Sequence, residues 1–575
     1  MLWRRRRKWN AEIAPDEIFL DAATSTSFNR DQFEGRLEKP LTRRTYVSLM
    51  IVIAGLISVL LLRAGQLEIV QGKAFAAESA NNSLAVTTLF ASRGAIVDVN
   101  GVPLAENVSH SDGSVTRYYA LPSMGQIMGY VSYPKKDAHG NYYDTKESGI
   151  AGLEAQYNSL LSGTNGQLLA ERDALGHIRS EGDIVPPQPG KTLRLSVNAN
   201  LEELFARALQ NVTVQQGFVA GAGVIMDVHT GAVQAIVSYP SYDPNVMSNG
   251  GPASAIAAYN TDPGHPFLDH AVQGVYTPGS IVKPFEAAGA LTDGVITPET
   301  TIDDTGLLTI KDPYHPGQVF RYTGWKALGL VTVRQAIAWS SDVFFYTVGG
   351  GFGPIKGLGI NRLDYWYRQF GLGTTTGIDL PGEASGLVPS PAWKQQVFGS
   401  PWYLGDTYFT AIGQYGMQVT PIQMVRATAA VANGGTLYTP TLLAGQKALG
   451  TPVAASPSAL QVVREGMRLG VTGTTLIGRI NLPYLAVAAK TGTAQVGSQN
   501  QYDNTWVEGF FPYDHPQYAF SVVLERGPSG AGEDAVWVMQ QLFDALYAEN
   551  SPYVGGTSTS TDVLASSTVP ALTGG

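Results

Sequence analysis

An uncharged apolar segment near the N-terminus places the strongest constraint on this chain. Residues 46–62 read YVSLMIVIAGLISVLLL and contain no charged side chain. A helix of that length rises about 25 Å, which approaches the ~30 Å thickness of a bilayer core. A helix buried in a soluble core rarely lacks a polar face over so many residues. The segment is therefore predicted to be a transmembrane helix.

Positive charges before this segment predict its orientation. Arg43 and Arg44 precede it directly, and a basic cluster lies upstream at residues 4–8, although such a cluster can equally be a solvated tail. The positive-inside rule makes residues 1–45 a cytoplasmic tail and places the later residues outside the cytoplasm. The cleavage-like residues 74–76 lie too far beyond the apolar run for a signal peptide. We therefore expect an uncleaved single-pass anchor in the inner (cytoplasmic) membrane.

Composition excludes several functional classes. Cysteine is absent, which excludes a disulfide framework, a thiolate zinc site and a cysteine nucleophile. The net charge of −9 argues against nucleic acid as a partner of the whole protein. Residues 551–575 are rich in Ser, Thr and Gly, which predicts a disordered tail.

A proline-rich stretch divides the exported part of the chain. Residues 186–190 read PPQPG and interrupt the regular patterns on both sides, which predicts a domain boundary. Residues 63–189 hold short strand-like runs, with a hairpin turn at Asn100-Gly101 and a helical pattern over 151–163. Residues 190–550 form the larger second domain.

The larger domain is predicted to be α+β. Two apolar runs flank residues 229–231 and predict a β-hairpin. Residues 282–431 are expected to form a long helical middle, so the pattern favours one antiparallel sheet flanked by helices. Further strands are predicted over residues 192–197, 484–489, 506–511 and 518–524, and helices over 201–209 and 535–547.

The segment YTPGSIVKPFE holds the first candidate catalytic pair. Ser280 and Lys283 are three residues apart and share one face of a helix. Pro284 is tolerated only in a first helical turn, which places the helix start near Ser280. There a hydroxyl lies at the positive helix end, and a neutral amine nearby can act as its base. The same spacing between Ser132 and Lys135 lacks this context, so spacing alone is weak evidence.

Two further polar motifs interrupt apolar segments. Ser340, Ser341 and Asp342 lie within AIAWSSDVFFYTV, where polar groups face a cavity or, in the simpler alternative, bond back to their own helix. The motif at 490–493, KTGT, lies in a strand of small residues, where a glycine marks the close approach of a ligand or another backbone. Its ammonium and hydroxyl groups suit a substrate carboxylate.

Together and in this order, the three motifs resemble those of the serine β-lactamases and penicillin-binding proteins, S-x-x-K, S-D-N and K-T-G. Asp342 stands where most members have Asn, as is usual in the elongation-type branch of class B penicillin-binding proteins (penicillin-binding protein 2). The resemblance covers residues 93 to about 549. Its other carriers are Arg93-Gly94, Asn100-Gly101, Gly152-Leu153-Glu154, GIDLPGEASGLVPSPAWK and GDTYFTAIGQYGMQVTPIQM.

This resemblance implies a fold and an activity. The fold is the α+β transpeptidase fold, an antiparallel sheet flanked by helices, preceded by a pedestal (dimerisation-like) domain over 63–189 and the single transmembrane helix. The activity is that of a serine-type D-Ala-D-Ala transpeptidase/carboxypeptidase without a cofactor. It cross-links peptidoglycan stem peptides through an acyl-enzyme during cell-wall elongation, which determines cell shape, and it binds β-lactam antibiotics covalently.

The resemblance also implies catalytic roles for individual residues. Ser280 attacks the carbonyl between the two terminal D-alanines, and Lys283 takes its proton. Ser340 relays a proton to the leaving amine. Asp342 orients Lys283 or Ser340, although its negative charge favours a charged Lys283. Lys490 keeps the site cationic and helps to hold Lys283 neutral.

Substrate binding is assigned in the same way. Thr491 and Thr493 bind the terminal carboxylate of the stem peptide, with Gly492 between them. The backbone N–H groups of Ser280 and Thr493 form the oxyanion hole, where the loss of one donor typically costs ~3–4 kcal/mol.

Partners are expected in the membrane. The N-terminal domain lacks the pattern of a glycosyltransferase, so glycan polymerisation requires a separate membrane glycosyltransferase, together with other elongation-complex proteins. The connection between Asn107 and Tyr130 is shorter than the head-like insertion of relatives, which weakens any inference about contacts made through that head.

A metal site is not predicted. A cluster of acidic and histidine side chains follows the nucleophile helix, in a region where some relatives bind zinc. Without cysteine this ligand set is incomplete, and we interpret the cluster as solvated loop residues. His265 and His270 are not predicted to bind a metal either. The cluster consists of Asp303, Asp304, Asp312 and His315.

Three alternatives share the motifs. A β-lactamase needs a base that activates water for deacylation, and no residue identifies one. A β-lactam sensor needs several spans or a cytoplasmic effector, and the 45 residues before Tyr46 are too few and too polar for one. A division-type transpeptidase differs only in its cellular role.

Overall fold

The computed structural model describes residues 43–75, 84–111, 115–138, 142–172, 178–312, 315, 317–474, 477–530 and 534–555. The basic cluster at 4–8, the predicted tail up to residue 42 and the C-terminal residues from 556 lie outside these ranges. The described residues form two compact units. The first lies within residues 1–85 and 169–182, and the second within residues 86–168 and 183–575.

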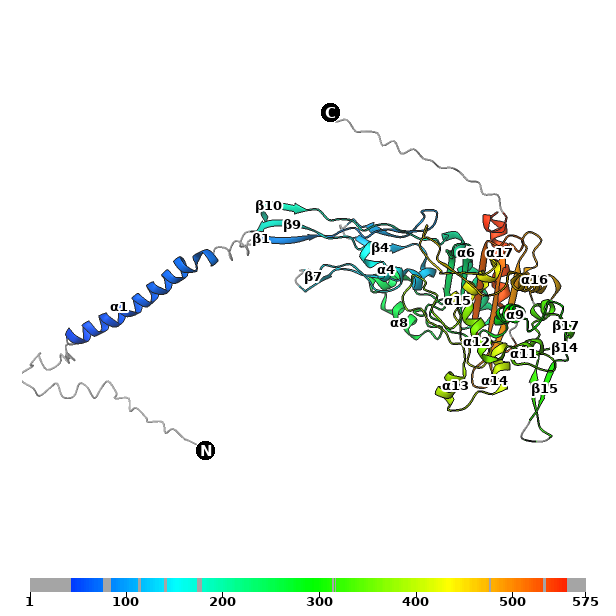
Figure 1. Ribbon diagram of the computed structural model, residues 1–575. Helices are drawn as coiled ribbons and strands as arrows, with labels where there is room; N and C mark the ends of the chain where they lie inside the picture. The colour runs from blue at the N-terminus through cyan, green and yellow to red at the C-terminus, as the bar shows by residue number, and fades with distance from the viewer. Residues whose placement is uncertain are drawn as a thin grey trace, which may run out of the picture. The chain divides into compact units, whose positions relative to one another are not determined.

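The first unit contains the predicted apolar helix. Helix α1 (Arg43–Gly65) covers all of residues 46–62 and continues into a π-helical turn, η3 (Gln66–Val70). It is long and apolar enough to cross a membrane, and none of its residues is buried in the protein. The helix prediction for this segment is therefore confirmed. Strands β1 (Leu84–Leu89), β9 (Gly166–Arg172) and β10 (Ile178–Val185) form a three-stranded sheet in the order β1-β9-β10 (Figure 1).

The N-terminal part of the second unit is built on a four-stranded sheet in the order β11-β2-β3-β4. Asp98 closes the predicted hairpin turn, because its Oδ1 accepts the N–H groups of Asn100 and Val102, and Gly101 takes a φ of 88°. The strands are β2 (Ile96–Val97), β3 (Pro103–Ser109), β4 (Val115–Tyr119) and β11 (Leu193–Arg194).

Short elements complete this part. The helical pattern over 151–163 forms two helices rather than one, because the chain leaves helical geometry at Tyr157. The elements are η4 (Pro122–Met124), α3 (Gly125–Met128), β5 (Val131–Ser132), β6 (Lys135–Lys136), β7 (Tyr142–Asp144), β8 (Ser148–Gly149), α4 (Gly152–Gln156) and α5 (Asn158–Leu161).

A five-stranded antiparallel sheet organises the rest of the unit, which confirms the predicted sheet of two early and three late strands. Its order is β13-β12-β22-β21-β20. The strand expected over 484–489 is displaced, because Leu482 and Leu485 pair within a turn after Asn481 and the strand begins at Ala488. The strands are β12 (Ala220–Asp227), β13 (Val233–Tyr239), β20 (Ala488–Val496), β21 (Tyr502–Phe511) and β22 (Tyr518–Pro528).

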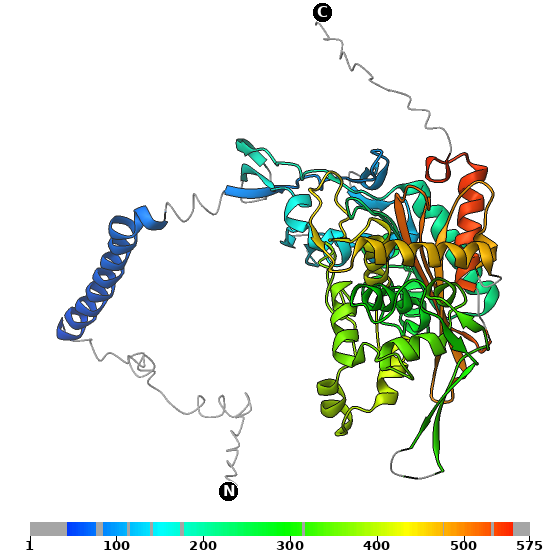
Figure 2. The same ribbon diagram turned by 45° about the vertical axis from the view of Figure 1, so that its right-hand side comes forward.

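Helices cover both faces of this sheet, so its strands read as nearly continuous apolar runs. On one face α6 (Ala199–Gln216) and α17 (Asp534–Ala548) pack against side chains such as Val507 and Val522. Figure 2 shows α17, in red, beside the orange strands. On the other face α9 (Lys283–Thr292), α15 (Pro421–Ala432) and α16 (Pro457–Gly473) pack around Trp506 and Phe510.

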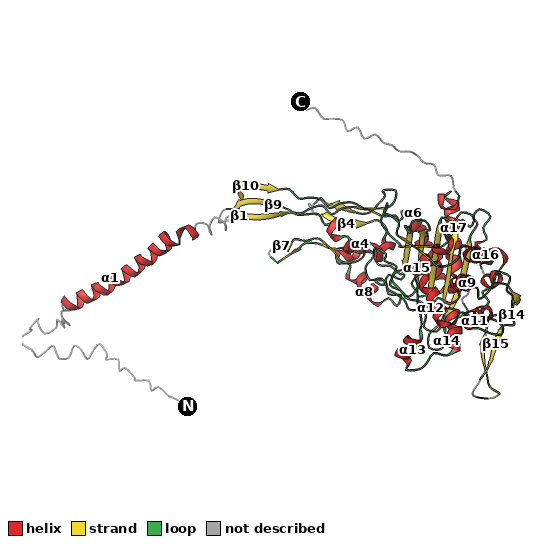
Figure 3. Ribbon diagram, viewed as in Figure 1, coloured by secondary structure: helices red, strands yellow, loops and turns green. Residues whose placement is uncertain are grey.

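The expected helical middle over 282–431 is interrupted by strands (Figure 3). The alternating segments LLTIK and VFRYT form the β15–β16 hairpin, and β14 pairs with β17. The strands are β14 (Ile302–Asp304), β15 (Leu307–Lys311), β16 (Val319–Thr323) and β17 (Gly329–Val331). The helices between α9 and α15 are α10 (Val333–Ala338), α11 (Asp342–Gly350), α12 (Gly359–Gln369), α13 (Pro391–Phe398) and α14 (Leu404–Ala411). Elsewhere lie α7 (Pro244–Asn249), α8 (Ala253–Thr261), β18 (Thr436–Tyr438), β19 (Gly450–Pro452), η6 (Gly478–Ile480) and η7 (Pro552–Val554).

The hydrophobic core of the second unit is continuous across residue 190. Ile96 and Leu153 belong to the same buried cluster as Val224 and Phe285. Strand β11, predicted as part of 192–197, joins β2 in the N-terminal sheet.

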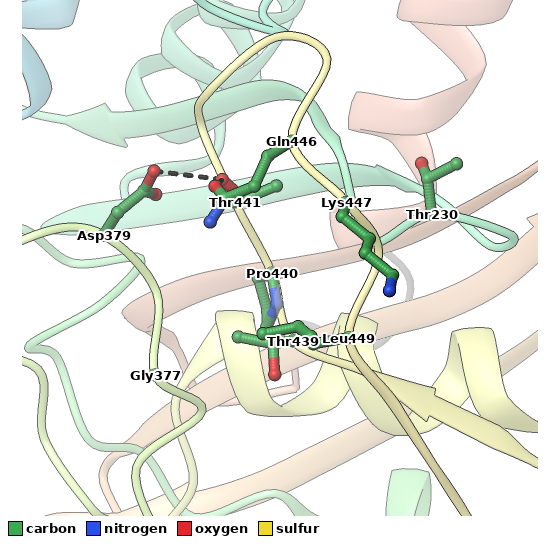
Figure 4. Close-up of a pocket in the computed structure, with 9 residues that line it drawn as sticks. All are labelled: Thr230, Gly377, Asp379, Thr439, Pro440, Thr441, Gln446, Lys447 and Leu449. Carbon is green, nitrogen blue, oxygen red and sulfur yellow. Dashed lines mark hydrogen bonds between the residues drawn. The ribbon is translucent and has the colours of Figure 1, made fainter.

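Polar contacts cross the same boundary at Asp379. This carboxylate accepts from Tyr157 Oη at 3.1 Å, Thr441 Oγ1 at 3.0 Å and the Leu442 N–H at 2.7 Å. It borders a small cavity of about 40 Å³, and Figure 4 shows its bond to Thr441.

Candidate active site

Ser280 lies in a tight turn that leads into α9. The turn is a 3-10 helix, η5 (Gly279–Val282), and Pro284 follows in the first turn of α9, as its missing N–H requires. Gly279 has a φ of 59°, and a methyl group there would lie 2.7 Å from the Thr493 carbonyl oxygen. Only glycine therefore allows this approach. The predicted helix start near Ser280 is confirmed.

The chain before Ser280 is held by the sheet and by the loop after α14. Tyr276 exchanges two backbone hydrogen bonds with Val419, and the Trp506 indole N–H donates to the Thr277 carbonyl at 3.0 Å. The Gly279 N–H donates to the Gly413 carbonyl at 3.0 Å. These bonds come from separate elements, so the backbone before the partly exposed Ser280 is held by other backbone segments and by the buried Trp506 indole.

Lys283 is fully buried and surrounded by acceptors. Its Nζ donates to the Ser340 carbonyl oxygen at 2.9 Å, to Ser340 Oγ at 3.3 Å and to Asp342 Oδ1 at 2.7 Å. Three acceptors match the three donors of an ammonium group.

The Ser340–Asp342 segment breaks the apolar stretch into two helices. Ser340 has a φ of 57°, an uncommon conformation for a residue with a Cβ, and its hydroxyl accepts from Lys283 rather than bonding to its own helix. Ser341 caps α11 by accepting the Phe344 N–H, and it donates to Asp304 Oδ2 at 2.5 Å. Asp342 is the first residue of α11, where the helix dipole favours a carboxylate.

Lys490 lies on β20 and is also fully buried. Its Nζ donates to the Thr491 carbonyl oxygen at 2.8 Å. Burial, and then the positive charge of Lys283, lower the pKa of Lys490 well below its usual range. Burial thus disfavours a charge on Lys490, whereas three acceptor oxygens lie around Lys283 Nζ.

Strand β20 lies directly against the turn that holds Ser280. A methyl group on Gly492 would lie 2.6 Å from the Pro278 carbonyl oxygen and 3.3 Å from the Ile281 nitrogen. Thr491 is buried, whereas Thr493 is exposed beside Gly279. The structure therefore brings all three predicted motifs together, Ser280 and Lys283 from the helix start, Ser340 and Asp342 from the helix break, and residues 490–493 from the sheet edge.

Two buried acids near the lysines were missed in the sequence. Glu508 is the direct partner of Lys490 on the neighbouring strand β21, and its Oε2 accepts from Thr428 Oγ1 at 2.9 Å. Glu286 lies one turn after Lys283, and neither carboxyl oxygen has a hydrogen-bond partner among the described residues. Burial raises the pKa of both acids well above the usual range. An acid within the apolar runs TWVEGFF and VKPFEAAGAL was the available signal.

Side chains of the acidic cluster after α9 form hydrogen bonds within the protein. Asp304 accepts from Ser341 and from the Gly306 N–H, and Asp312 contacts the His315 ring at 2.9 Å. The described ranges contain no group of three or more His, Cys, Asp or Glu side chains placed to hold a metal ion. His270 is buried, and its two ring nitrogens contact Tyr276 Oη and the Gly264 carbonyl.

Comparisons with known proteins agree with this geometry. Residues 221–544 match the family model of the penicillin binding protein transpeptidase domain, and residues 109–195 match that of the penicillin-binding protein dimerisation domain. The peptidoglycan D,D-transpeptidase MrdA of Escherichia coli K12 is 34% identical in an alignment of 474 residues that covers 76% of this chain and 71% of MrdA. The chain belongs to the family of penicillin-binding-protein transpeptidases. It is a class B, elongation-type peptidoglycan D,D-transpeptidase.

Solved structures of this family show the same fold. Penicillin-binding protein 2 of Pseudomonas aeruginosa, in complex with WCK 5153, is 32% identical with a TM-score of 0.66 over 80% of this chain and 96% of that chain. The Helicobacter pylori protein, in complex with MreC, is 25% identical with a TM-score of 0.69 over 81% of this chain and 99% of that chain. The predicted family, fold class and enzyme class are confirmed, and the elongation type is preferred over the three alternatives.

Proposed function

We propose that this D,D-transpeptidase forms its acyl-enzyme on Ser280, with Lys283 as the general base. The contacts of Lys283 carry the proposal. A neutral amine can accept the Ser280 proton, and the ammonium that forms is then stabilised by Asp342 and by two oxygens of Ser340. Because this stabilisation grows as the proton is transferred, it lowers the barrier rather than only binding the ground state.

The proposed reaction assigns a step to each of these groups. Ser280 Oγ forms a bond to the carbonyl carbon between the terminal D-alanines while its proton moves to Lys283 Nζ. The proton then passes through Ser340 Oγ to the nitrogen of the leaving D-alanine as the peptide bond breaks. An amine from a neighbouring stem peptide then attacks the ester carbonyl carbon, and the bond from this carbon to Ser280 Oγ breaks. The proton that the amine loses passes through the same groups to Ser280 Oγ. A β-lactam is attacked in the same way, and its amide nitrogen stays attached.

The proposed oxyanion hole consists of the backbone N–H groups of Ser280 and Thr493. The contact between Gly279 and the Thr493 backbone supports it, since it brings the two segments together. Lys490, Thr491 and Thr493 are proposed to bind the terminal carboxylate of the stem peptide, with Gly492 allowing the close approach of the strand.

Labelling with fluorescent penicillin tests the nucleophile. Ser280→Ala is expected to abolish the covalent adduct. Ser132→Ala is the matched control, because Ser132 has the same spacing to Lys135 but lies on β5, and it is expected to label like the unmodified enzyme. A covalent adduct in Ser280→Ala would refute the assignment.

We further propose that α1 anchors the enzyme in the inner membrane with the N-terminus in the cytoplasm. The exposed apolar side chains of α1 and the basic residues Arg43 and Arg44 support this topology. A pedestal over 63–189 would then carry the transpeptidase domain over 190–550 outside the cytoplasm. Reporter fusions at the two ends of the chain test the orientation, and activity of an exported-only reporter at the N-terminus would contradict it.

Partners are proposed from the relatives. The H. pylori protein was solved with MreC, so an MreC-like elongation protein and a membrane glycosyltransferase are proposed to bind this enzyme. Affinity purification from membranes tests this, and absence of both proteins from the purified complex would contradict it.

A further inference from the structure

A row of polar side chains crosses the core beneath the proposed active site. Lys490 on β20, Glu508 on β21 and Ser521 on β22 are direct cross-strand partners, so their side chains share one face of the sheet. All three are fully buried on the face that α9 and α15 cover. Burying such groups is costly without partners, and an apolar row would be the default. The row therefore requires an explanation.

Glu508 is only partly satisfied by hydrogen bonds. Its Oε2 accepts from Thr428 on α15, whereas Oε1 is buried without a hydrogen-bond partner among the described residues. Ser521 Oγ is in the same situation. Lys490 donates to the Thr491 carbonyl instead of to Glu508. The Glu508 carboxyl group therefore lies opposite Lys490 on the neighbouring strand but forms no direct ion pair with it.

The charges around this row are few. Lys283 from α9 opposes a positive charge on Lys490, whereas Asp342 from α11 and Glu508 from β21 favour it. Asp342 is already engaged with Lys283 at 2.7 Å. The groups that face Glu508 from α15 and β22 are the uncharged Thr428 and Ser521. Glu286 faces Lys283 from within α9.

We propose that Glu508 is a positioning residue that controls the charge of Lys490 and thereby the affinity of the site for the carboxylate of a stem peptide or β-lactam. This rests on the proposed function, in which Lys490 and its neighbours bind that carboxylate. In the empty site burial favours the neutral form of both groups, because it raises the pKa of Glu508 and lowers that of Lys490. When a carboxylate binds, Glu508 loses a proton and Lys490 gains one. The pair keeps the same net charge, so the core takes up no proton from solvent.

This mechanism predicts an unusual pH dependence. Between pH 6.5 and 8.5 the pre-acylation Kd for benzylpenicillin is expected to be nearly independent of pH, because the proton stays within the pair. In Glu508→Gln the proton must come from solvent. Its Kd is then expected to be at least tenfold weaker at pH 8 and to increase about tenfold per pH unit above the pKa of Lys490. The maximal acylation rate should change less than threefold.

The experiment uses the full chain in detergent and stopped-flow acylation at several penicillin concentrations, which separates Kd from the maximal rate. Glu202→Gln is the matched control, because Glu202 is a fully buried carboxyl on α6, against the opposite face of the sheet. It should keep the flat profile. Thr428→Val, which removes the hydrogen bond to Glu508, should weaken binding in the same direction by a smaller factor.

The outcomes are distinct. An unchanged, pH-independent Kd in Glu508→Gln overturns the proposal, as does a loss confined to the maximal rate. If Glu508→Gln does not fold, Thr428→Val decides, and an unaltered Kd there overturns the proposal. If Ser280→Ala still forms a covalent adduct with fluorescent penicillin, the proposed function is refuted. The Kd measured for Glu508→Gln is a separate result and does not depend on that assay.

Discussion

Asp342 and Lys283 determine the electrostatics of the site at the scale of single residues. The 2.7 Å contact joins a fully buried amine to a carboxylate at a helix N-terminus, where the dipole adds to its stability. A neutral amide at this position keeps an acceptor oxygen but not the charge. Hydrogen bonds to charged groups contribute about 1.5–3 kcal/mol, more than those between neutral groups.

If Lys283 is the proposed general base, Asp342→Asn is expected to slow acylation of the enzyme by penicillin roughly 10- to 100-fold, because the ammonium formed on Lys283 loses about 1.5–3 kcal/mol of stabilisation. Stopped-flow measurement of the maximal acylation rate checks this. Asp303→Asn, at an exposed acid on β14, is the control and should leave the rate unchanged. An unaltered rate in Asp342→Asn would show that the carboxylate charge has no catalytic effect.

The buried carboxyl group of Glu202 is expected to make the stability of the protein, rather than its activity, depend on pH. Burial raises the pKa of Glu202 from 4.5 to about 8. Between these values the native state holds a proton that the unfolded state has released, so the free energy of unfolding falls as pH rises. The full shift corresponds to ~5 kcal/mol. Glu202→Gln removes this loss, and its unfolding temperature relative to the parent should rise from pH 5 to pH 8.5. Parallel curves at all pH values would contradict the assignment.

Glycines at contacts between elements determine how closely the motifs approach. Gly492 on β20 lies against the Pro278 carbonyl, and any side chain there must push the strand away from the turn that holds Ser280. Gly492→Ala is expected to reduce acylation at least 100-fold, because displacement of Thr493 would weaken the proposed oxyanion hole by about 3 kcal/mol.

Gly478→Ala on η6 is the matched control, because no atom lies within 4 Å of the added methyl group. It should acylate normally. Circular dichroism and acylation rates of both variants check the prediction, and normal acylation of Gly492→Ala would show that the strand can move without loss of the site.

Local patterns predicted the elements whose bonding is local. The hairpin at 229–231, the apolar helix at 46–62 and the helix start at Ser280 depend on turn residues, run length and proline chemistry, and each was predicted correctly. Element boundaries that depend on tertiary hydrogen bonds were not predicted correctly. The break at Ser340 follows from bonds to Lys283, far away in sequence.

The same distinction holds for the site. The sequence motifs identified Ser280, Lys283 and residues 490–493, because the residues of each motif lie close together along the chain. Glu508 and Glu286 become neighbours of the lysines only through sheet pairing and helix packing. Their apolar surroundings indicated burial, but register between β20 and β21 was needed to place Glu508 opposite Lys490.

At the scale of the whole molecule, the second unit behaves as one folded body. Its apolar cluster runs from Ile96 and Leu153 to Val224 and Phe285, and Asp379 links Tyr157 to Thr441. The proline-rich stretch therefore lies close to where the match to one family model gives way to the match to the other, but it does not separate the hydrophobic core into two. Cooperative unfolding of both parts follows, because neither can expose its half of the cluster alone.

Glu154 offers a test of that cooperativity. It is fully buried and binds Arg93 Nε at 2.6 Å and Arg117 Nε at 2.8 Å. Glu154→Gln leaves two buried guanidinium groups without their counter-charge, which costs about 3–5 kcal/mol. Although this network lies far along the chain from Ser280, a shared core means that the temperature at which penicillin binding is lost should fall by the same amount as the calorimetric transition. Glu106→Gln, at an exposed acid on β3, should change neither. Two separate transitions, with only the lower one moved by Glu154→Gln and binding retained, would show that the pedestal and the catalytic domain unfold independently.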